Sequence, residues 1–492
     1  MKKFLSTMFI IVVFSMVLFG CDKVPRLDTK NFNTYTIDAY FDDSTKTLSA
    51  YQTVKYTNRT PNVLNNVDFH LYPNAFSEDA QNKPVSLVNI PKAYPNGISY
   101  GGINITLLKV NNKTSPINII GVDNNILSVK LNKDLYPDES VTINMEYQVT
   151  LPNVNHRFGY GGSTYNFGNF YPIACVYNNG FMTKPYNSNG DPFYSDMANY
   201  NVKLTFDKDF KIASTGEVKL KTKDNLSCAE IKISAVRDFA FVLSKKFQTI
   251  STTINNTKIT YYYYEDEYSA SNLKIAKDAI KTFNELFGKY PYKTLSVVKT
   301  NFLHGGMEYP TLVYVSDDIV NNLEYQNVIV HEIAHQWWYN LVGSNAYDNA
   351  WQDEGLTEYS TLMFYQQNPQ YGVDFKERIQ SVMASYMLFV DVFESVNGSL
   401  DTSMNRPLDK YDSEMEYVYL TYVKGTLMFD EIRSVMGDKK FKKALQYYFN
   451  NNCYGIAYPE DLIYAFNKKT SKNMESFINS WLSGKVVLKK AS

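Results

Sequence analysis

The chain contains 492 residues, of which 44% are hydrophobic and 20% are charged. This composition excludes a mainly disordered chain and supplies enough apolar residues for two or three domains. The 49 basic and 50 acidic residues nearly cancel, and no long basic run occurs, so nucleic acid is not an expected partner. Four cysteines are too few for a disulfide scaffold.

The N-terminus has the pattern of an export signal. A short basic start precedes an apolar run from Phe4 to Gly20, which is short for a bilayer span of about 20 residues. Gly20 directly before Cys21 resembles the lipobox of bacterial lipoproteins, in which this cysteine becomes the lipidated first residue. We therefore expect residues 1–20 to be a signal peptide, residues 21–30 a tether, and Cys21 a lipid anchor on the outer side of the cytoplasmic membrane. The alternative is an uncleaved membrane anchor.

Lipidation of Cys21 would leave Cys175, Cys228 and Cys453. Three cysteines permit at most one disulfide, and their spacing does not indicate whether one forms. The sequence does not indicate an oligomeric state either.

Residues 31–250 have the pattern of β-strands. Apolar residues alternate with polar ones along 35–41, and the Asp-Asp-Ser turn at 42–44 leads into a second strand. Further strands are predicted at 67–72, 103–110, 126–131, 141–147, 202–206, 231–234 and 239–243. The pattern predicts an all-β domain, either a sandwich or a saddle-shaped sheet. Within it, the Asn- and Gly-rich stretch Tyr177–Asp191 is predicted to be a long surface loop.

The pattern becomes mainly helical after about residue 250. Three more strands are predicted at 259–264, 295–299 and 311–315. Helices are predicted at 269–288, 327–341, 355–367, 378–393, 417–436, 441–450, 459–468 and 474–482. We therefore predict a multidomain α and β protein, in which the all-β domain precedes a mainly α domain over residues 251–492.

The predicted helix over 327–341 contains His331-Glu332-x-x-His335. Side chains four residues apart lie on one face of a helix, so the two imidazoles can share one metal ion while Glu332 reaches a water bound to it. Two histidines at this spacing can also arise by chance or form a polar helix face. The chain has only 5 histidines, which makes chance a weak explanation, and the flanking residues are too apolar for a solvated face. The motif therefore predicts a metal site.

A catalytic zinc site needs a third protein ligand and one open position. Glu354 lies 19 positions after His335 (354 − 335), at the start of the next predicted helix, and can complete a His2Glu set. These ligands favour one Zn²⁺ per chain, although Co²⁺ is not excluded. By itself, Glu354 could instead be a carboxylate favoured by the helix dipole. Glu358, one turn further, can accept a hydrogen bond from a ligand imidazole or can be a surface charge.

Two further motifs accompany the metal pattern, Gly305-Gly306-Met307-Glu308 and Tyr422-x-Lys-Gly. With His331, Glu332, His335 and Glu354 they resemble the gluzincin zinc aminopeptidases, the family of aminopeptidase N and leukotriene hydrolase. The resemblance implies a saddle-like β domain, a thermolysin-like catalytic domain, and removal of single residues from peptide N-termini. The segment Phe441–Lys485 resembles the close of the family's catalytic domain. We therefore expect no large helical C-terminal domain of the kind that covers the active site in longer members, and a cleft more open to longer peptides.

The resemblance implies a role for each motif residue. Glu332 would be the general base, and Tyr422 would donate a hydrogen bond to the oxyanion. Glu308 would hold the substrate α-ammonium, while Gly305, Gly306 and Met307 would let the substrate backbone pair as an added strand. Two positions depart from the family. Tyr309 stands in place of an Asn, and the segment Tyr171–Cys175 contains no carboxylate to help Glu308.

The expected function is therefore that of a membrane-anchored, extracytoplasmic zinc aminopeptidase acting on peptides. Two alternatives remain open. The same site could act as an endopeptidase or on a non-peptide substrate such as an epoxide. The chain could also be an inactive surface-binding protein, although the presence of Glu332 and Tyr422 argues against this.

Overall fold

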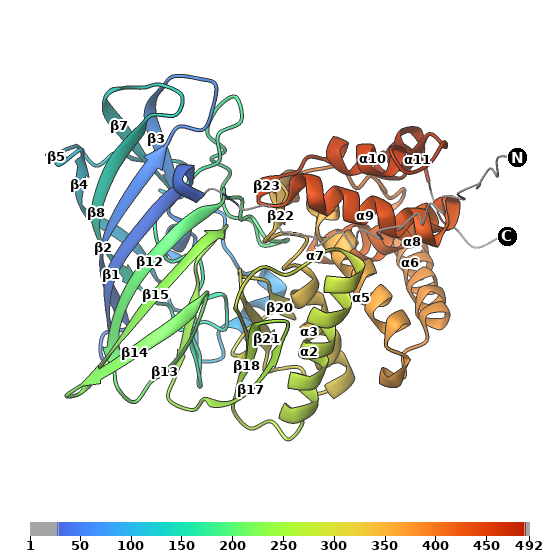
Figure 1. The fold of residues 1–492 in the computed structure, drawn as a ribbon, viewed down its shortest axis with the longest axis horizontal. Helices are drawn as coiled ribbons and strands as arrows, with labels where there is room; N and C mark the ends of the chain where they lie inside the picture. The colour runs from blue at the N-terminus through green and yellow to red at the C-terminus, as the bar shows by residue number, and fades with distance from the viewer. Residues whose placement is uncertain (1–26, 28, 487, 489–492) are drawn as a thin grey trace, which may run out of the picture.

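The computed structural model describes residue 27, residues 29–486 and residue 488. The predicted signal peptide, Cys21 and most of the predicted tether lie outside these residues. Figure 1 shows the long strands on one side of the molecule and most helices on the other. The predicted fold class, an all-β part followed by a mainly α part, is confirmed.

The largest sheet has eight strands. They are β1 (Asn33–Asp42), β2 (Thr47–Thr57), β4 (Gly102–Val110), β5 (Lys113–Thr114), β8 (Ser140–Thr150), β12 (Ala198–Asp207), β14 (Glu217–Lys223) and β15 (Leu226–Val236). Their order is β14-β15-β12-β1-β2-β8-β4-β5, and β1 pairs in parallel with β12. In β1 the apolar side chains from Tyr35 to Phe41 are buried and the intervening polar ones are exposed, so this alternation produces a sheet with one face in the core.

Two four-stranded sheets complete the β part. Their strands are β3 (Leu64–His70), β6 (Ile119–Ile120), β7 (Ile126–Leu135), β9 (Phe158–Tyr160), β10 (Tyr165–Phe167), β11 (Ile173–Ala174), β13 (Lys211–Ser214) and β16 (Phe241–Ser244). The orders are β13-β16-β10-β9 and β11-β3-β7-β6. The short helices in this part are η1 (Thr29–Asn31), η2 (Tyr72–Phe76), η3 (Leu87–Asn89) and α1 (Ile90–Ala93). Cys175, Cys228 and Cys453 are free thiols.

A five-stranded sheet lies between the β part and the helices. Its strands are β17 (Gln248–Ile254), β18 (Thr257–Tyr263), β19 (Thr294–Thr300), β20 (Gly306–Met307) and β21 (Leu312–Ser316), in the order β17-β18-β19-β21-β20. Strands β18, β19 and β21 are parallel, and α2 (Ser269–Leu286) connects β18 to β19. The short strand β20 pairs antiparallel to β21 and forms one edge.

Strand β21 belongs to both hydrophobic cores. Leu312 and Tyr314 pack in the core of the β part. Val313 and Val315 pack in the core of the helical part. All five residues of β21 are buried, as expected for a parallel strand covered on both faces.

The remaining elements form the helical part. They are α3 (Asn322–Ala334), β22 (Val342–Gly343), α4 (Ala346–Asn349), η4 (Ala350–Gln352), α5 (Glu354–Gln367), η5 (Pro369–Tyr371), α6 (Phe375–Asn397), η6 (Leu408–Lys410), α7 (Glu414–Val418), η7 (Tyr419–Val423), α8 (Lys424–Met436), α9 (Asp438–Asn452), β23 (Gly455–Ile456), α10 (Pro459–Asn467) and α11 (Met474–Leu482). Among the described residues, α6 alone combines the length and apolar composition that a membrane span requires, and 17% of that apolar window is buried.

Several predicted helices differ by a few residues at their ends, and two differ more. The helix expected over 327–341 begins earlier, because the Asn321 side chain accepts hydrogen bonds from the backbone N–H groups of Leu323 and Glu324. It also ends earlier, at Ala334, because the chain then turns so that β22 can pair with β23. The helix expected over 417–436 is divided by the π-helical turn η7.

Candidate active site

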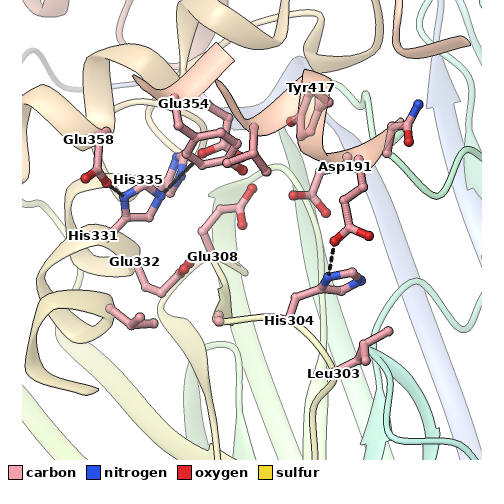
Figure 2. A pocket seen from close by; sticks show the side chains of 18 of the residues that line it. Asp191, Leu303, His304, Glu308, His331, Glu332, His335, Glu354, Glu358 and Tyr417 are labelled. Carbon is pink, nitrogen blue, oxygen red and sulfur yellow. Dashed lines mark hydrogen bonds and ion pairs between the residues drawn. The ribbon is translucent and has the colours of Figure 1, made fainter. Parts of the chain in front are cut away.

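The predicted metal ligands come together from α3 and α5. His331 and His335 lie one turn apart on α3, and Glu354 is the first residue of α5. The Asp353 side chain caps α5 by accepting a hydrogen bond from the Glu354 N–H at 2.9 Å. All three ligand side chains are buried, and Figure 2 shows them meeting at one end of a cavity.

The spacing of the three donor atoms fits a zinc ion. Nε2 of His331 lies 3.1 Å from Nε2 of His335, and Oε2 of Glu354 lies 3.3 Å and 3.1 Å from these two nitrogens. Bonds of about 2.0–2.1 Å at tetrahedral angles place zinc ligand atoms about 3.3–3.4 Å apart. The His-His-Glu group therefore fits Zn²⁺ in both chemistry and geometry.

The other ring nitrogen of each histidine has its own partner. Nδ1 of His331 lies 2.9 Å from Oε2 of Glu358. Nδ1 of His335 lies 2.9 Å from the carbonyl oxygen of Trp338. When each Nδ1–H donates to these acceptors, Nε2 presents its lone pair to the shared centre. Glu358 therefore lies where the sequence suggested, against a ligand imidazole.

The electrostatics of the group favour a cation. Burial alone would lower the pKa of His331, but hydrogen bonds with Glu354 and Glu358 raise it to about 10. Burial would raise the pKa of Glu354, and the two histidines instead hold it below its ordinary range. The carboxylates thus favour positive charge at the point where the three donor atoms meet.

Glu332 points into the cavity beside the edge strand β20. It is buried, and its Oε2 atom has no hydrogen-bond partner. Burial is the main cause that raises the Glu332 pKa to about 7, against the opposing effect of His331 and His335. A Cβ atom at Gly306 would lie 2.3 Å from Oε1 of Glu332, so a larger residue there would displace this carboxylate.

The π-helical turn η7 carries Tyr422 to the metal group. The Tyr422 ring is stacked on the His331 ring, with 6.0 Å between their centroids. Burial and the nearby Glu354 raise the Tyr422 pKa well above its ordinary value, so the phenol keeps its proton at neutral pH. Short π-helical segments often occur at functional sites.

The Lys-Gly part of the Tyr-x-Lys-Gly motif fixes this turn. Lys424 is buried, and its Nζ donates to the carbonyl oxygens of Thr402 at 2.6 Å and Trp481 at 3.2 Å. A Cβ atom at Gly425 would lie 2.9 Å from Cα of Gly355 on α5. The two glycines thus let α8 approach the helix that begins with Glu354.

Glu308 lies directly after β20 and lines the same cavity, which has a volume of about 550 Å³. The other residues of its motif, Gly305, Gly306 and Met307, form the edge of the sheet and the turn before it. Burial raises the Glu308 pKa well above its ordinary value, and the carboxylate of Asp191 raises it further. A positively charged ligand group beside Glu308 would offset the cost of ionising this buried carboxyl group.

Asp191 is a further site residue that no sequence motif marks. It ends the stretch predicted to be a surface loop, but residues 188–191 turn inward and line the cavity. The buried Arg157 forms an ion pair with Asp191 and packs over the Phe193 ring. The structure thus brings an N-terminal carboxylate to Glu308 from a segment that lies outside Tyr171–Cys175. A lone Asp in an Asn/Gly-rich loop gave no signal of this.

Two further tyrosines, Tyr417 and Tyr309, lie at or near the cavity without belonging to a predicted role. Tyr417 lines the cavity, and its ring lies edge-on to that of Tyr422, with centroids 5.8 Å apart. Tyr309 is buried, and its hydroxyl donates to Oδ1 of Asn169 at 2.7 Å. Gly168 leaves space for that hydroxyl, because a Cβ atom there would lie 1.8 Å from it. The Tyr309 side chain, which stands in place of the family's Asn, therefore fills space between the two parts of the protein.

A His-Glu-x-x-His helix completed by a glutamate from the next helix is the arrangement typical of the gluzincin class of metallopeptidases. Residues 271–481 match the family described as "Peptidase family M1 domain". This match, which covers less than half of the chain, supports the resemblance to the gluzincin family of aminopeptidase N.

Relatives support this resemblance over part of their length. The chain is 31% identical over 224 residues to aminopeptidase N of Lactobacillus helveticus, covering 43% of this chain and 26% of the relative. It is 25% identical over 307 residues to tricorn protease-interacting factor F2 of Thermoplasma volcanium, covering 58% of this chain and 37% of the relative. The chain thus matches about a quarter of the first relative and a little over a third of the second.

Solved structures share the whole fold. The M1 zinc metallopeptidase from Deinococcus radiodurans aligns with a TM-score of 0.63 at 16% identity, covering 93% of this chain and 95% of that one. A variant of that enzyme bound to a Tyr-Ser-Ala substrate aligns with a TM-score of 0.64 at 15% identity and the same coverage. The predicted two-part arrangement therefore occurs in a zinc metallopeptidase of similar length.

Proposed function

We propose that the protein is a zinc aminopeptidase, which hydrolyses the first peptide bond of peptides with a free N-terminus. The observation that carries this proposal is the pair Glu308 and Asp191, two carboxylates that line one cavity with the His-His-Glu group. An α-ammonium group between them would be held one residue away from the metal group. The position of the free amine would therefore determine that the first peptide bond lies at the metal group and is cleaved.

His331, His335 and Glu354 would hold the zinc ion. When bound, zinc lowers the pKa of a coordinated water to about 7 and polarises a carbonyl group. The partners of both Nδ1 atoms keep the imidazoles oriented with Nε2 toward this point. The three ligands would therefore bind and position the zinc ion, and other side chains would transfer the protons.

Glu332 is the proposed general base and acid. Its unpartnered Oε2 faces the cavity, where it can accept a proton from the attacking water and later deliver it to the leaving amine. A pKa of about 7 suits both transfers at neutral pH. Tyr422, which remains protonated, can donate its hydroxyl hydrogen to the oxyanion that forms at the carbonyl carbon.

The test compares the wild-type protein with Glu332→Gln on a panel of amino-acid amides, with and without a chelator. We expect the wild type to release free amino acids, and both the substitution and the chelator to reduce turnover by at least about 10²-fold. Metal analysis of Glu332→Gln should still find one zinc, because Glu332 is not a ligand. Activity that persists in both cases would refute the mechanism.

Peptides with free and N-acetylated termini separate the proposal from its main alternative. An aminopeptidase should cleave the free forms much faster than the acetylated forms. Equal cleavage of both forms would favour an endopeptidase that uses the same metal group.

We also propose that the protein is a lipoprotein held outside the cytoplasmic membrane through Cys21. The support is the sequence alone, a basic start and an apolar run followed by Gly20-Cys21. The test is the partition of the wild type and Cys21→Ser between membrane and soluble fractions, with mass analysis of the mature N-terminus. A wild-type N-terminus without lipid would refute the anchor.

A further inference from the structure

The catalytic cavity meets a second, larger groove. This groove has a volume of about 1190 Å³ and lies between the segment around η3 and α1 and the helix α7. Five residues line both spaces. They are Asn89, Ser188, Asn189, Glu414 and Val418. The cavity and the groove therefore adjoin at these five residues.

The groove is apolar and open to solvent. Leu87 is 85% exposed and Val88 is 83% exposed, although both are large apolar residues. Ile98, Tyr100 and Met415 line the same groove and are also exposed. Such a surface suits the apolar side chains of an extended peptide.

Glu414 lines both spaces and is held there by contacts with three other side chains. Its Oε2 accepts hydrogen bonds from Nδ2 of Asn89 at 2.7 Å and from Oγ of Ser86 at 3.4 Å. Its Oε1 lies 3.6 Å from Nδ1 of His304. We call Glu414, Asn89, Ser86 and His304 the Glu414 clasp. It links the β part, the turn before β20, and α7.

The Glu414 clasp lies beyond the proposed amine position. In the view of Figure 2, His304 lies on the far side of Glu308 from His331, and Asp191 lies between Glu308 and the His304 ion pair. A substrate held with its carbonyl at the metal group and its ammonium at Glu308 therefore has the clasp next in line. A residue upstream of that ammonium that extends in this direction would meet the side chains of the clasp.

We propose that the Glu414 clasp limits the enzyme to free N-termini, and that the groove behind it is where apolar residues upstream of the cleaved bond would bind once the clasp is open. This inference rests on the proposed aminopeptidase function. In this proposal the contacts of Glu414 exclude residues upstream of the cleaved bond, whereas Glu308 and Asp191 attract the free amine. The occupant of the opened groove is an extended apolar peptide segment.

The test measures kcat/KM for two substrates, leucine 4-nitroanilide and N-acetyl-Leu-Leu-Leu 4-nitroanilide. In Glu414→Ala we expect the ratio of blocked to free substrate to rise at least about tenfold over the wild type. Asn89→Ala, which removes the partner on the β part, should raise the ratio in the same direction. Glu431→Ala, at an exposed position on α8, is the matched control and should leave it unchanged.

A second substitution tests the groove itself. Adding Met415→Asp to Glu414→Ala places a charge in the groove and should remove the gained cleavage of the blocked substrate, while hydrolysis of the free substrate stays as in Glu414→Ala. If Glu414→Ala and Asn89→Ala cleave leucine 4-nitroanilide but keep the wild-type ratio of blocked to free substrate, the proposed role of the clasp is wrong and the aminopeptidase function still stands. A wild-type enzyme that cleaves no amino-acid amide would overturn the proposed function and the clasp with it.

Discussion

Replacing Glu308 by Gln tests how the substrate amine is recognised. The substitution keeps the side-chain shape and one acceptor oxygen but removes the negative charge. Glu308 is only 4% exposed, so its bond with an ammonium group would form away from bulk water. Such a charged hydrogen bond contributes about 1.5–3 kcal/mol, which corresponds to about 10- to 160-fold in kcat/KM.

The assay compares the same peptide amide with a free and with an acetylated N-terminus. Glu308→Gln should lower kcat/KM for the free form by about 10- to 160-fold and should leave the slow cleavage of the acetylated form unchanged, because that form carries no ammonium. Glu285→Gln, at an exposed position on α2, is the matched control. If Glu308→Gln lowers both activities equally, Glu308 acts on the chemistry or the fold and does not recognise the amine.

Three further predictions concern the oxyanion, the helix contact and a buried acid. Tyr422→Phe should lower kcat by about 10²–10³ with little change in KM, since the hydroxyl acts mainly in the transition state; a change in KM alone would contradict this role. Gly425→Ala should lower the thermal midpoint and destabilise the fold by about 1–3 kcal/mol, because its Cβ would press on Gly355; an unchanged midpoint would show that the helices can separate freely. Burial raises the pKa of Asp238 from 3.8 to about 7. The folded state therefore binds this proton more tightly than the unfolded state does. As the pH rises from 3.8 to about 7, the free energy of unfolding should fall by at most about 4 kcal/mol. Asp238→Asn should flatten that slope in denaturant titrations at several pH values, and a slope equal to that of the wild type would reject the assignment.

The periodic elements could be predicted from local pattern. Alternation along β1 and the spacing of His331, His335 and Glu354 each depend on a short stretch of chain, and both correspond to what the structure contains. The ends of helices were harder to predict from the sequence. The cap at Asn321 and the turn after Ala334 depend on one side chain and on a distant strand, which the apolar periodicity does not report.

The parts of the site that the sequence did not reveal come from tertiary contacts. Asp191 is brought inward by Arg157 and by Asn189, whose Nδ2 donates to the carbonyl oxygens of Leu408 and Tyr411. Arg157, Leu408 and Tyr411 are all far from Asp191 in sequence. The π-helical turn before Lys424 was likewise not evident, because the apolar spacing of residues 417–436 also fits a continuous helix.

Strand β21 has a consequence for how the protein unfolds. Its side chains alternate between two cores, so neither part can lose its structure without exposing one face of the shared sheet to water. The β part and the helical part should therefore melt in one cooperative transition, and a fragment that begins at β17 would present Leu312 and Tyr314 to solvent and tend to aggregate. The β part is then a folding partner for the catalytic residues as well as the source of Asp191.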